Sequence, residues 1–467
     1  MHFSKITEKD IDDGKYKGNQ RNIMMIVGNG FDIDVLHFLN KPGTRYSDFV
    51  DYIEENESDD YKTNNNLYQK LKKGKEDKKW SDLESDIKTI IEEQLSKTNE
   101  EDFEKGLIKL KNDLKNIKTT FAKFLRKQVT PEINSQVVEN ANPHDGKELE
   151  QNENKESNYP VNAVAKFLGD LTPDDYRKLK FKKYQTRHES QSLSNEEGAL
   201  GYYTLYNWLF VNLNYTSIFD NCFDFNKRFF DPFRNKSSMT NISFYPAWKQ
   251  MYDRLLVTRT INGGEGYIRS NKIKFSSYLM SNIIHPHGKE WVPDSMLFGF
   301  SSVQQLKVQP QNNNIEKLIK EFIKPLWSVS KLKYEPLFGE ADLFIVYGAS
   351  IGESDAWWWN HILEQLKKNV DETGHQPELI IYNYLEPTEN EVGIDALKDG
   401  NKAALEGISE DVKKRFVREA LSYNTCVVEP SEVDSEYEYV KDKIFVVSYD
   451  NNYKKVAFTF PEGNRQG

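Results

Sequence analysis

Short apolar runs alternate with helical patterns along this chain and predict a sheet of buried strands. The strand candidates lie at residues 23–27, 208–213, 283–284, 296–298, 343–347 and 379–384. Strands that alternate with helices usually pair in parallel. The pattern therefore predicts an α/β fold with a Rossmann-like, mainly parallel sheet.

A second kind of β signal lies near the end of the chain. Two β-rich runs, 444–449 and 456–460, flank Asp450-Asn451-Asn452, which are turn-forming residues. This pattern predicts a C-terminal β-hairpin, either at a sheet edge or as a small appendage.

A long helical insertion separates the first two strand candidates. Its apolar positions recur at alternating spacings of four and three, at Phe103, Leu107, Leu110, Leu114, Ile117, Phe121 and Phe124. This spacing is typical of a coiled-coil seam. The preceding segment repeats apolar residues every fourth position from Leu83 to Leu95, and Thr98-Asn99 separates the two. We expect an inserted α-helical hairpin whose seam packs within the chain or joins copies in a homo-oligomer.

The patterns divide the chain into five parts. Residues 138–160 are polar and nearly free of aliphatic side chains, which predicts a flexible linker. The parts are a first piece of the Rossmann-like domain at 1–55, the helical insertion at 56–137, the linker at 138–160, the rest of that domain at 161–390, and a C-terminal helix and β-hairpin at 391–467.

Composition narrows the partner classes. The 467 residues exceed what one core usually serves, and the formal charge of −10 gives no basic field for nucleic acid. No stretch approaches the roughly 18 apolar residues of a membrane helix, so we expect a cytoplasmic protein without a membrane partner. Cys222 and Cys426 lack C-x-x-C spacing, so we expect two core thiols and no metal site.

The most informative motif follows the first strand candidate. Gly28-Asn29-Gly30-Phe31-Asp32 is a strand-to-helix turn of the kind whose backbone amides face phosphate. The third glycine of the dinucleotide fingerprint is replaced by Ile33. The motif therefore indicates a nucleotide site, or else a tight turn that binds nothing.

Three more motifs follow strand candidates in the same way. They are Asn214-Tyr215-Thr216, His285-Pro286-His287-Gly288 and the run from Gly348 to Asp355. In open α/β sheets the ligand crevice lies outside the carboxyl ends of the strands. We therefore expect motifs separated by more than 300 residues to converge there.

These motifs, in this order, resemble those of the AbiH family of bacterial abortive-infection proteins. The family's hallmarks are GNGFD, NYT, an HG step and G-x-S-x-G-x-x-D, matched here at Gly28–Asp32, Asn214–Thr216, His287-Gly288 and Gly348–Asp355. The segment from Trp80 to Glu84 is similar to the family's W-x-x-x-E element. The resemblance implies a role in phage defence, with a phage-derived protein as a possible trigger.

The motif order is also distantly similar to that of the sirtuin-like NAD-binding fold. That likeness implies NAD or a related adenine nucleotide as ligand or substrate. The chain departs from the sirtuin pattern at Asn29, where alanine is usual, and at Thr216, where an aspartate would hold the nicotinamide carboxamide. Two cysteines also cannot supply the sirtuin zinc ribbon, so protein deacetylation is not expected.

If the chain cleaves an N-glycosidic bond, we expect the following roles for these residues. His287 suits polarisation or deprotonation of a ribose hydroxyl, and Asn214 suits positioning of the attacking water. Asp32 or Asp355 would accept hydrogen bonds from ribose hydroxyls. The full set expected to bind the nucleotide is Gly28, Asn29, Gly30, Phe31, Asp32, Thr216, Gly348, Ser350, Gly352 and Asp355.

Structural roles for the same residues remain open. The histidines 285 and 287 could bond backbone carbonyls, and Asn214 or Asp355 could cap the helix that follows it. Glu84 is either catalytic or lid-borne, or part of a capping box with Ser81.

Two further features have other possible functions. Gly348-x-Ser350-x-Gly352 copies a hydrolase nucleophile elbow, which would need a later histidine, either His361 or His375. The tryptophans 357 to 359 cannot all face one way on a helix, so burial or contact with a partner is expected.

Two functions follow. The chain is either an enzyme that cleaves the N-glycosidic bond of NAD on infection, or a nucleotide-binding sensor or scaffold that hydrolyses nothing. The sensor would act through the helical insertion and a tryptophan-rich surface.

Overall fold

The fold is taken from a computed structural model. It describes residues 20–76, 83–96, 100–141, 159–181, 205–223, 278–310, 312–368, 376–386, 390–450 and 452–460. Residues 142–158 of the expected linker, the Ser81 capping box and His375 lie outside this part, while residues 138–141 belong to a helix.

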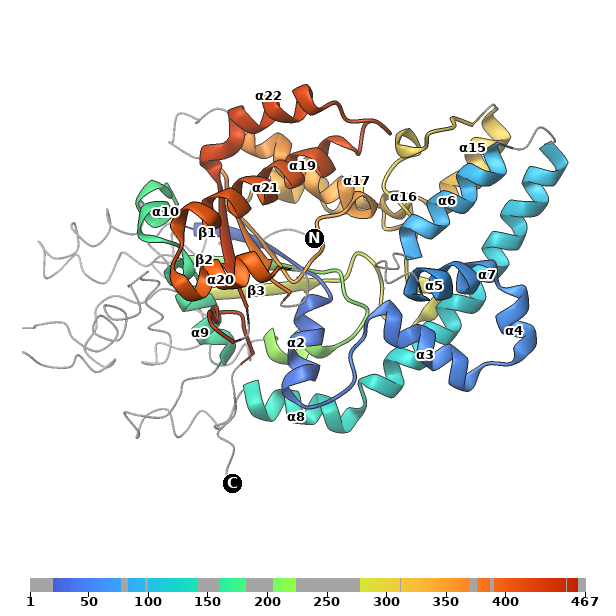
Figure 1. Ribbon diagram of the computed structural model, residues 1–467, viewed down its shortest axis with the longest axis horizontal. Coiled ribbons are helices and arrows are strands. Elements are labelled where there is room, and N and C mark those ends of the chain that lie inside the picture. The colour runs from blue at the N-terminus through green and yellow to red at the C-terminus, as the bar shows by residue number, and fades with distance from the viewer. Residues whose placement is uncertain are drawn as a thin grey trace, which may run out of the picture.

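A six-stranded parallel sheet forms the centre of the molecule (Figure 1). Its strands are β1 (Gln20–Val27), β2 (Leu205–Asn212), β3 (Tyr278–Ile284), β4 (Leu343–Tyr347), β5 (Glu378–Tyr384) and β6 (Ile444–Tyr449). Every neighbouring pair is parallel, and the spatial order is β3-β2-β1-β4-β5-β6. The predicted α/β fold is confirmed, and the strand order reverses direction between β1 and β4.

Two strand predictions were wrong. Met296 and Phe298 lie in irregular chain, where both side chains are buried in a helical core. The C-terminal hairpin does not form: β6 is an edge strand that pairs in parallel with β5, and residues 456–460 form no strand beside it. The Asp450 carboxylate accepts hydrogen bonds from the amides of residues 452, 453 and 454, and the chain then buries Phe458 against the sheet. Apolar packing therefore takes the place of strand pairing at this end.

Helices cover both faces of the sheet because each central strand is apolar on both sides. Met25 and its neighbours pack against α2 (Gly30–Phe38), α8 (Pro131–Ala141), α9 (Tyr159–Lys166) and α12 (Ile218–Phe223). Met24 and its neighbours pack against α18 (Glu335–Phe338), α19 (Ala356–Leu366), α21 (Lys402–Leu421) and α22 (Pro430–Val440). The short helices α10 (Pro173–Lys178) and α20 (Glu391–Asp399) complete this body. We call it the sheet domain.

A second body, the helical lobe, lies beside the sheet domain (Figure 1). It comprises α3 (Tyr46–Asn56), α4 (Asp59–Asn64), α5 (Asn66–Glu76), α6 (Leu83–Leu95), α7 (Glu100–Gln128) and a later segment with α15 (Asn313–Ile319). Its core already includes Phe49 of α3, whereas α8 packs on the sheet. The lobe is therefore assembled from two stretches of chain.

The coiled-coil seam of α7 is buried inside this lobe. All seven seam residues are at most 6% exposed and pack against α3, α5, α6 and the segment 296–323. Packing within one chain therefore covers the seam, and no association between copies is needed to bury it.

Two smaller predictions concern exposure. Cys222 is buried as expected, but Cys426 is exposed, so the prediction of a second core thiol was wrong. The tryptophans 357 to 359 are all buried, at 3%, 3% and 0% exposure, so they form core and not a surface. In the part of the chain that the structure describes, no helix is long and apolar enough to cross a membrane.

Candidate functional site

Two glycine-containing loops touch at the carboxyl end of the sheet. The amide of Gly28 donates to the Tyr347 carbonyl at 3.0 Å, and the amide of Gly30 donates to the Gly348 carbonyl at 2.7 Å. A Cβ at Gly30 would lie 2.8 Å from the Cα of Gly348, so only glycine permits this approach. The amide of Phe31 donates to Gly28 at 3.1 Å. Three of the amides expected to face pyrophosphate, those of Gly28, Gly30 and Phe31, are thus bonded within the chain.

The Asp32 carboxyl lies in the first turn of α2 and is completely buried. The Asn214 side-chain amide donates to Asp32 Oδ1 at 2.9 Å and to the Gly28 carbonyl at 3.1 Å, and the Thr216 hydroxyl donates to Asp32 Oδ2. Among the described residues, none donates to the side-chain oxygen of Asn214. Asn214 therefore links its own motif to the Gly28–Asp32 motif and does not cap α12.

Burial raises the pKa of Asp32 to about 7, although its hydrogen bonds with Thr216 and Asn214 favour the charged form. Asp32 can therefore gain or lose a proton near neutral pH.

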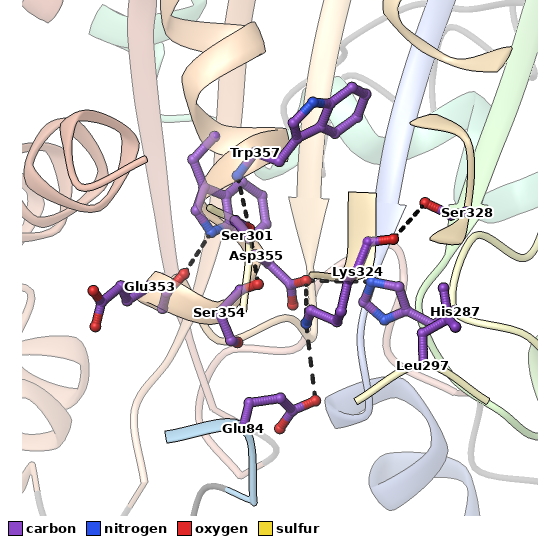
Figure 2. A network of polar contacts seen from close by, with 12 residues as sticks. Glu84, His287, Leu297, Ser301, Lys324, Ser328, Glu353, Ser354, Asp355 and Trp357 are labelled. Atoms are coloured by element: carbon purple, nitrogen blue, oxygen red, sulfur yellow. Dashed lines mark hydrogen bonds and ion pairs between the residues drawn. The ribbon is translucent and has the colours of Figure 1, made fainter. Parts of the chain in front are cut away.

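A second polar group of side chains lies around Asp355 (Figure 2). The Nε2 atom of His287 lies 3.3 Å from Asp355 Oδ1, and the Lys324 ammonium lies 2.7 Å from the same oxygen. Figure 2 shows Glu84 reaching the other side of the ammonium from α6, with 3.9 Å between Lys324 Nζ and Glu84 Oε1. Asp355 makes these contacts and caps no helix amide with its side chain. Asp355 thus holds the N-cap position of α19, as the sequence allowed, but its side chain serves the polar group and not the helix.

The charges in this group shift the ionisation of its members. Burial disfavours the charged form of Asp355, but Lys324 and His287 outweigh it and hold the pKa of this carboxyl well below its usual range. Burial lowers the pKa of His287, and although Asp355 and the Leu213 carbonyl raise it in part, Lys324 adds to the lowering and the pKa stays below its usual value. His287 is thus neutral at neutral pH while Asp355 is ionised. The other nitrogen of the imidazole faces the Leu213 carbonyl, so both ring nitrogens point at acceptors within the chain.

The two histidines of the HPH step face different partners. The Nε2 atom of His285 lies 2.9 Å from Asp220 Oδ1, an oxygen that the Lys289 ammonium also contacts at 2.9 Å. Burial opposes ionisation of Asp220, but His285 and Lys289 lower its pKa overall. His285 therefore belongs to a separate ion cluster, and only His287 lies beside Asp355.

A family comparison matches residues 24–373 to the model described as "Bacteriophage abortive infection AbiH". The chain belongs to the AbiH family. The AbiH match contains every residue placed above at the sheet edge and in the Asp355 group, and the family supports a role in phage defence by abortive infection. No curated protein and no solved structure matched the chain. The likeness to the sirtuin-like fold therefore stays a prediction.

Three more residues of this AbiH protein were expected to bind the nucleotide, namely Asn29, Ser350 and Gly352. Asn29 is exposed and exchanges hydrogen bonds with Thr44, and the Gly352 carbonyl accepts from the Trp359 indole at 3.0 Å. Ser350 is exposed, whereas the Nδ1 atom of His361 lies 2.7 Å from the Trp357 carbonyl. His361 therefore bonds within its own helix and does not act as the histidine that a nucleophile elbow at Ser350 would need.

Sequence reasoning missed Lys324 altogether. This residue is one of 63 basic residues, and no motif surrounds it. Glu84 was left open and is now placed beside Lys324, with its other oxygen accepting from the Tyr46 hydroxyl at 3.2 Å. Within the described ranges, no group of three or more His, Cys, Asp or Glu residues is arranged to hold a metal ion.

Proposed function

We propose that this AbiH protein binds NAD or a related adenine nucleotide at the carboxyl edge of the sheet and cleaves its N-glycosidic bond on infection. One observation carries the proposal. The strand order β3-β2-β1-β4-β5-β6 is the order of dinucleotide-binding sheets, which bind where the order reverses. Asp32 follows β1 and Asp355 follows β4, the two strands at this reversal, and Asn214, which follows β2, bonds to Asp32.

The side chains at this edge suit the reaction. Water adds to the ribose carbon, nicotinamide leaves with the electrons of the broken bond, and the proton of water passes to a base. The free side-chain oxygen of Asn214 can accept a hydrogen bond from that water, and Asp32, with a pKa of about 7, can accept the proton. Neutral His287 can accept a hydrogen bond from a ribose hydroxyl once one ring nitrogen is released.

The site is closed in this structure, which supports activity only on infection. The amides of Gly28, Gly30 and Phe31 are bonded within the chain, and His287 is 6% exposed. Phosphate binding by these three amides therefore requires the two glycine loops to separate. We propose that a phage-derived trigger favours this open form, which the ligand then stabilises.

Nicotinamide release tests the enzymatic proposal. Purified protein is incubated with NAD, with and without lysate from infected cells. We expect His287→Ala to lower turnover by roughly 10²–10⁴-fold with binding largely retained. Asn214→Ala should act on the same step, so that the double variant is little worse than either single variant. His37→Ala, an exposed histidine on α2, is the matched control. Parental turnover by either site variant, or none by the parent in triggered cells, contradicts catalysis.

A nucleotide-binding sensor is the second candidate function. The bonding of the site within the chain favours this function. Closed glycine loops and an enclosed imidazole are as compatible with a conformational switch as with an enzyme at rest. Its expected signature is calorimetric binding of NAD or ADP-ribose without nicotinamide release. The tryptophan-rich surface proposed for the sensor is buried, which leaves the helical lobe as its contact surface.

A further inference from the structure

Lys324 is buried at a point where a lysine is costly. It begins α16 (Lys324–Trp327) and is 3% exposed. The Lys324 amide donates to the Phe300 carbonyl at 3.0 Å, and the Lys324 carbonyl accepts from the Ser328 hydroxyl at 3.0 Å. A buried ammonium is tolerated only when it is paired, and Asp355 supplies the pairing at 2.7 Å. The backbone of this residue is thus fixed, and its charge is directed at the Asp355 group.

Asp355 has two possible cationic partners on one oxygen. Lys324 and His287 both contact Oδ1, at 2.7 and 3.3 Å. A protonated His287 would place a second positive charge at that oxygen. This charge would be buried, because His287 is only 6% exposed, and the ammonium would repel it. The imidazole therefore donates its Nε2 proton to Asp355 as a neutral ring.

The other groups around the imidazole do not replace this effect. The Tyr215 ring packs with its centre 6.5 Å from that of His287, and the Leu213 carbonyl faces the second nitrogen. Glu84 contacts the Lys324 ammonium from α6 and not the imidazole (Figure 2). Lys324 is thus the positive charge in direct contact with the carboxylate that orients His287.

We propose that Lys324 is a positioning residue, which neutralises Asp355 and so keeps His287 uncharged and oriented as a base. The meaning of this role for catalysis rests on the proposed function. A neutral imidazole retains a nitrogen that can accept a proton, whereas a charged imidazole has none. Removing the ammonium leaves His287 as the one remaining cationic partner of Asp355 among the described residues, so the histidine should become protonated.

NMR titration of the histidine side chains tests the proposal in the full chain. His287→Ala assigns the resonance among the eight histidines. We expect Lys324→Met to raise the His287 pKa by at least one unit, which is about a tenfold increase in the protonated-to-neutral ratio at fixed pH. Lys324→Arg, which keeps the charge, should leave the pKa low. An unchanged His287 pKa in a folded Lys324→Met protein overturns the proposal.

A second variant covers the case in which Lys324→Met does not fold. Asp355→Asn removes the carboxylate and retains the ammonium, so the His287 pKa should fall below that of the parent. A rise, or no change, contradicts the charge arrangement.

Activity gives a separate readout. If the parent releases nicotinamide, the acidic limb of the Lys324→Met pH profile should move to higher pH by the same amount as the His287 pKa, with turnover recovering at high pH. A merely structural defect would lower turnover equally at every pH, and that result would also overturn the proposal. A parent without turnover removes the enzymatic function, while the titration still decides the role of Lys324.

Discussion

Among single residues, the Asp32 carboxyl makes the stability of the protein depend on pH. Burial raises its pKa from its ordinary value to about 7. The folded protein therefore holds a proton that the unfolded chain has lost by about pH 5. The stability contributed by this proton is full at pH values below about 4 and is lost as the pH rises through 7, a total of roughly 4 kcal/mol.

We expect Asp32→Asn to flatten this dependence. The new amide reproduces the protonated acid, because its oxygen can accept from Asn214 and its NH₂ group can donate to Thr216. Above pH 7 the variant should be more stable than the parent by about 1–4 kcal/mol, and near pH 4 the two should converge.

Urea unfolding at several pH values between 4 and 8 measures this difference. Asp170 and Glu290, which burial also gives pKa values of about 7, titrate in both proteins, so the comparison isolates Asp32. Equal pH dependence in parent and variant would show that Asp32 is already ionised in the folded state at pH 5.

Among the elements, α7 determines whether the helical lobe holds together. Leu107 lies in the buried seam at 2% exposure, while its neighbour Ile108 lies on the outer side of the same helix at 56%. We expect Leu107→Ala to lower the free energy of unfolding by about 2–5 kcal/mol through a cavity. Ile108→Ala, the matched control, should change it by less than about 0.5 kcal/mol.

Circular dichroism and light scattering together check this prediction. Because the seam is covered within one chain, the molar mass should not change in either variant. Release of smaller, still helical particles by Leu107→Ala would instead identify the seam as an interface between copies.

At the scale of the whole molecule, the helical lobe and the sheet domain meet at the proposed site. Lys88 of α6 pairs with Glu353 of η8 (Glu353–Asp355), next to the contact between Glu84 and Lys324. The pair is partly exposed, with 36% of the Glu353 side chain accessible, so its coupling energy should be about 1 kcal/mol or less.

A charge swap tests whether this pair docks the two bodies. Lys88→Glu should lower the melting temperature by about 1–3 °C and speed hydrogen exchange around residue 355. Adding Glu353→Lys should restore both values. If the double variant is no better than Lys88→Glu alone, the pair does not link the lobe to the site.

The sequence by itself determined the features that depend on local pattern. Uninterrupted apolar runs mark β1 and β4 because a strand covered on both faces cannot carry polar side chains, and the four-three spacing marks α7 because its buried face recurs with each turn. The convergence of the glycine loop with Asn214 followed from parallel pairing, since the carboxyl ends of such strands share one edge.

Only the tertiary structure decided features that depend on contacts between distant segments. The 296–298 and 456–460 runs look like strands locally, but the structure buries their side chains in two hydrophobic cores without adding either run to the sheet. Asp32 acquires its raised pKa because the fold buries it completely, and this burial outweighs the hydrogen bond from Asn214, 182 residues away, which favours the charged form. Lys324 carries no local signal, because a lysine beside a proline normally lies on the surface. Its role follows from the buried carboxylate that the fold brings to within 2.7 Å of it.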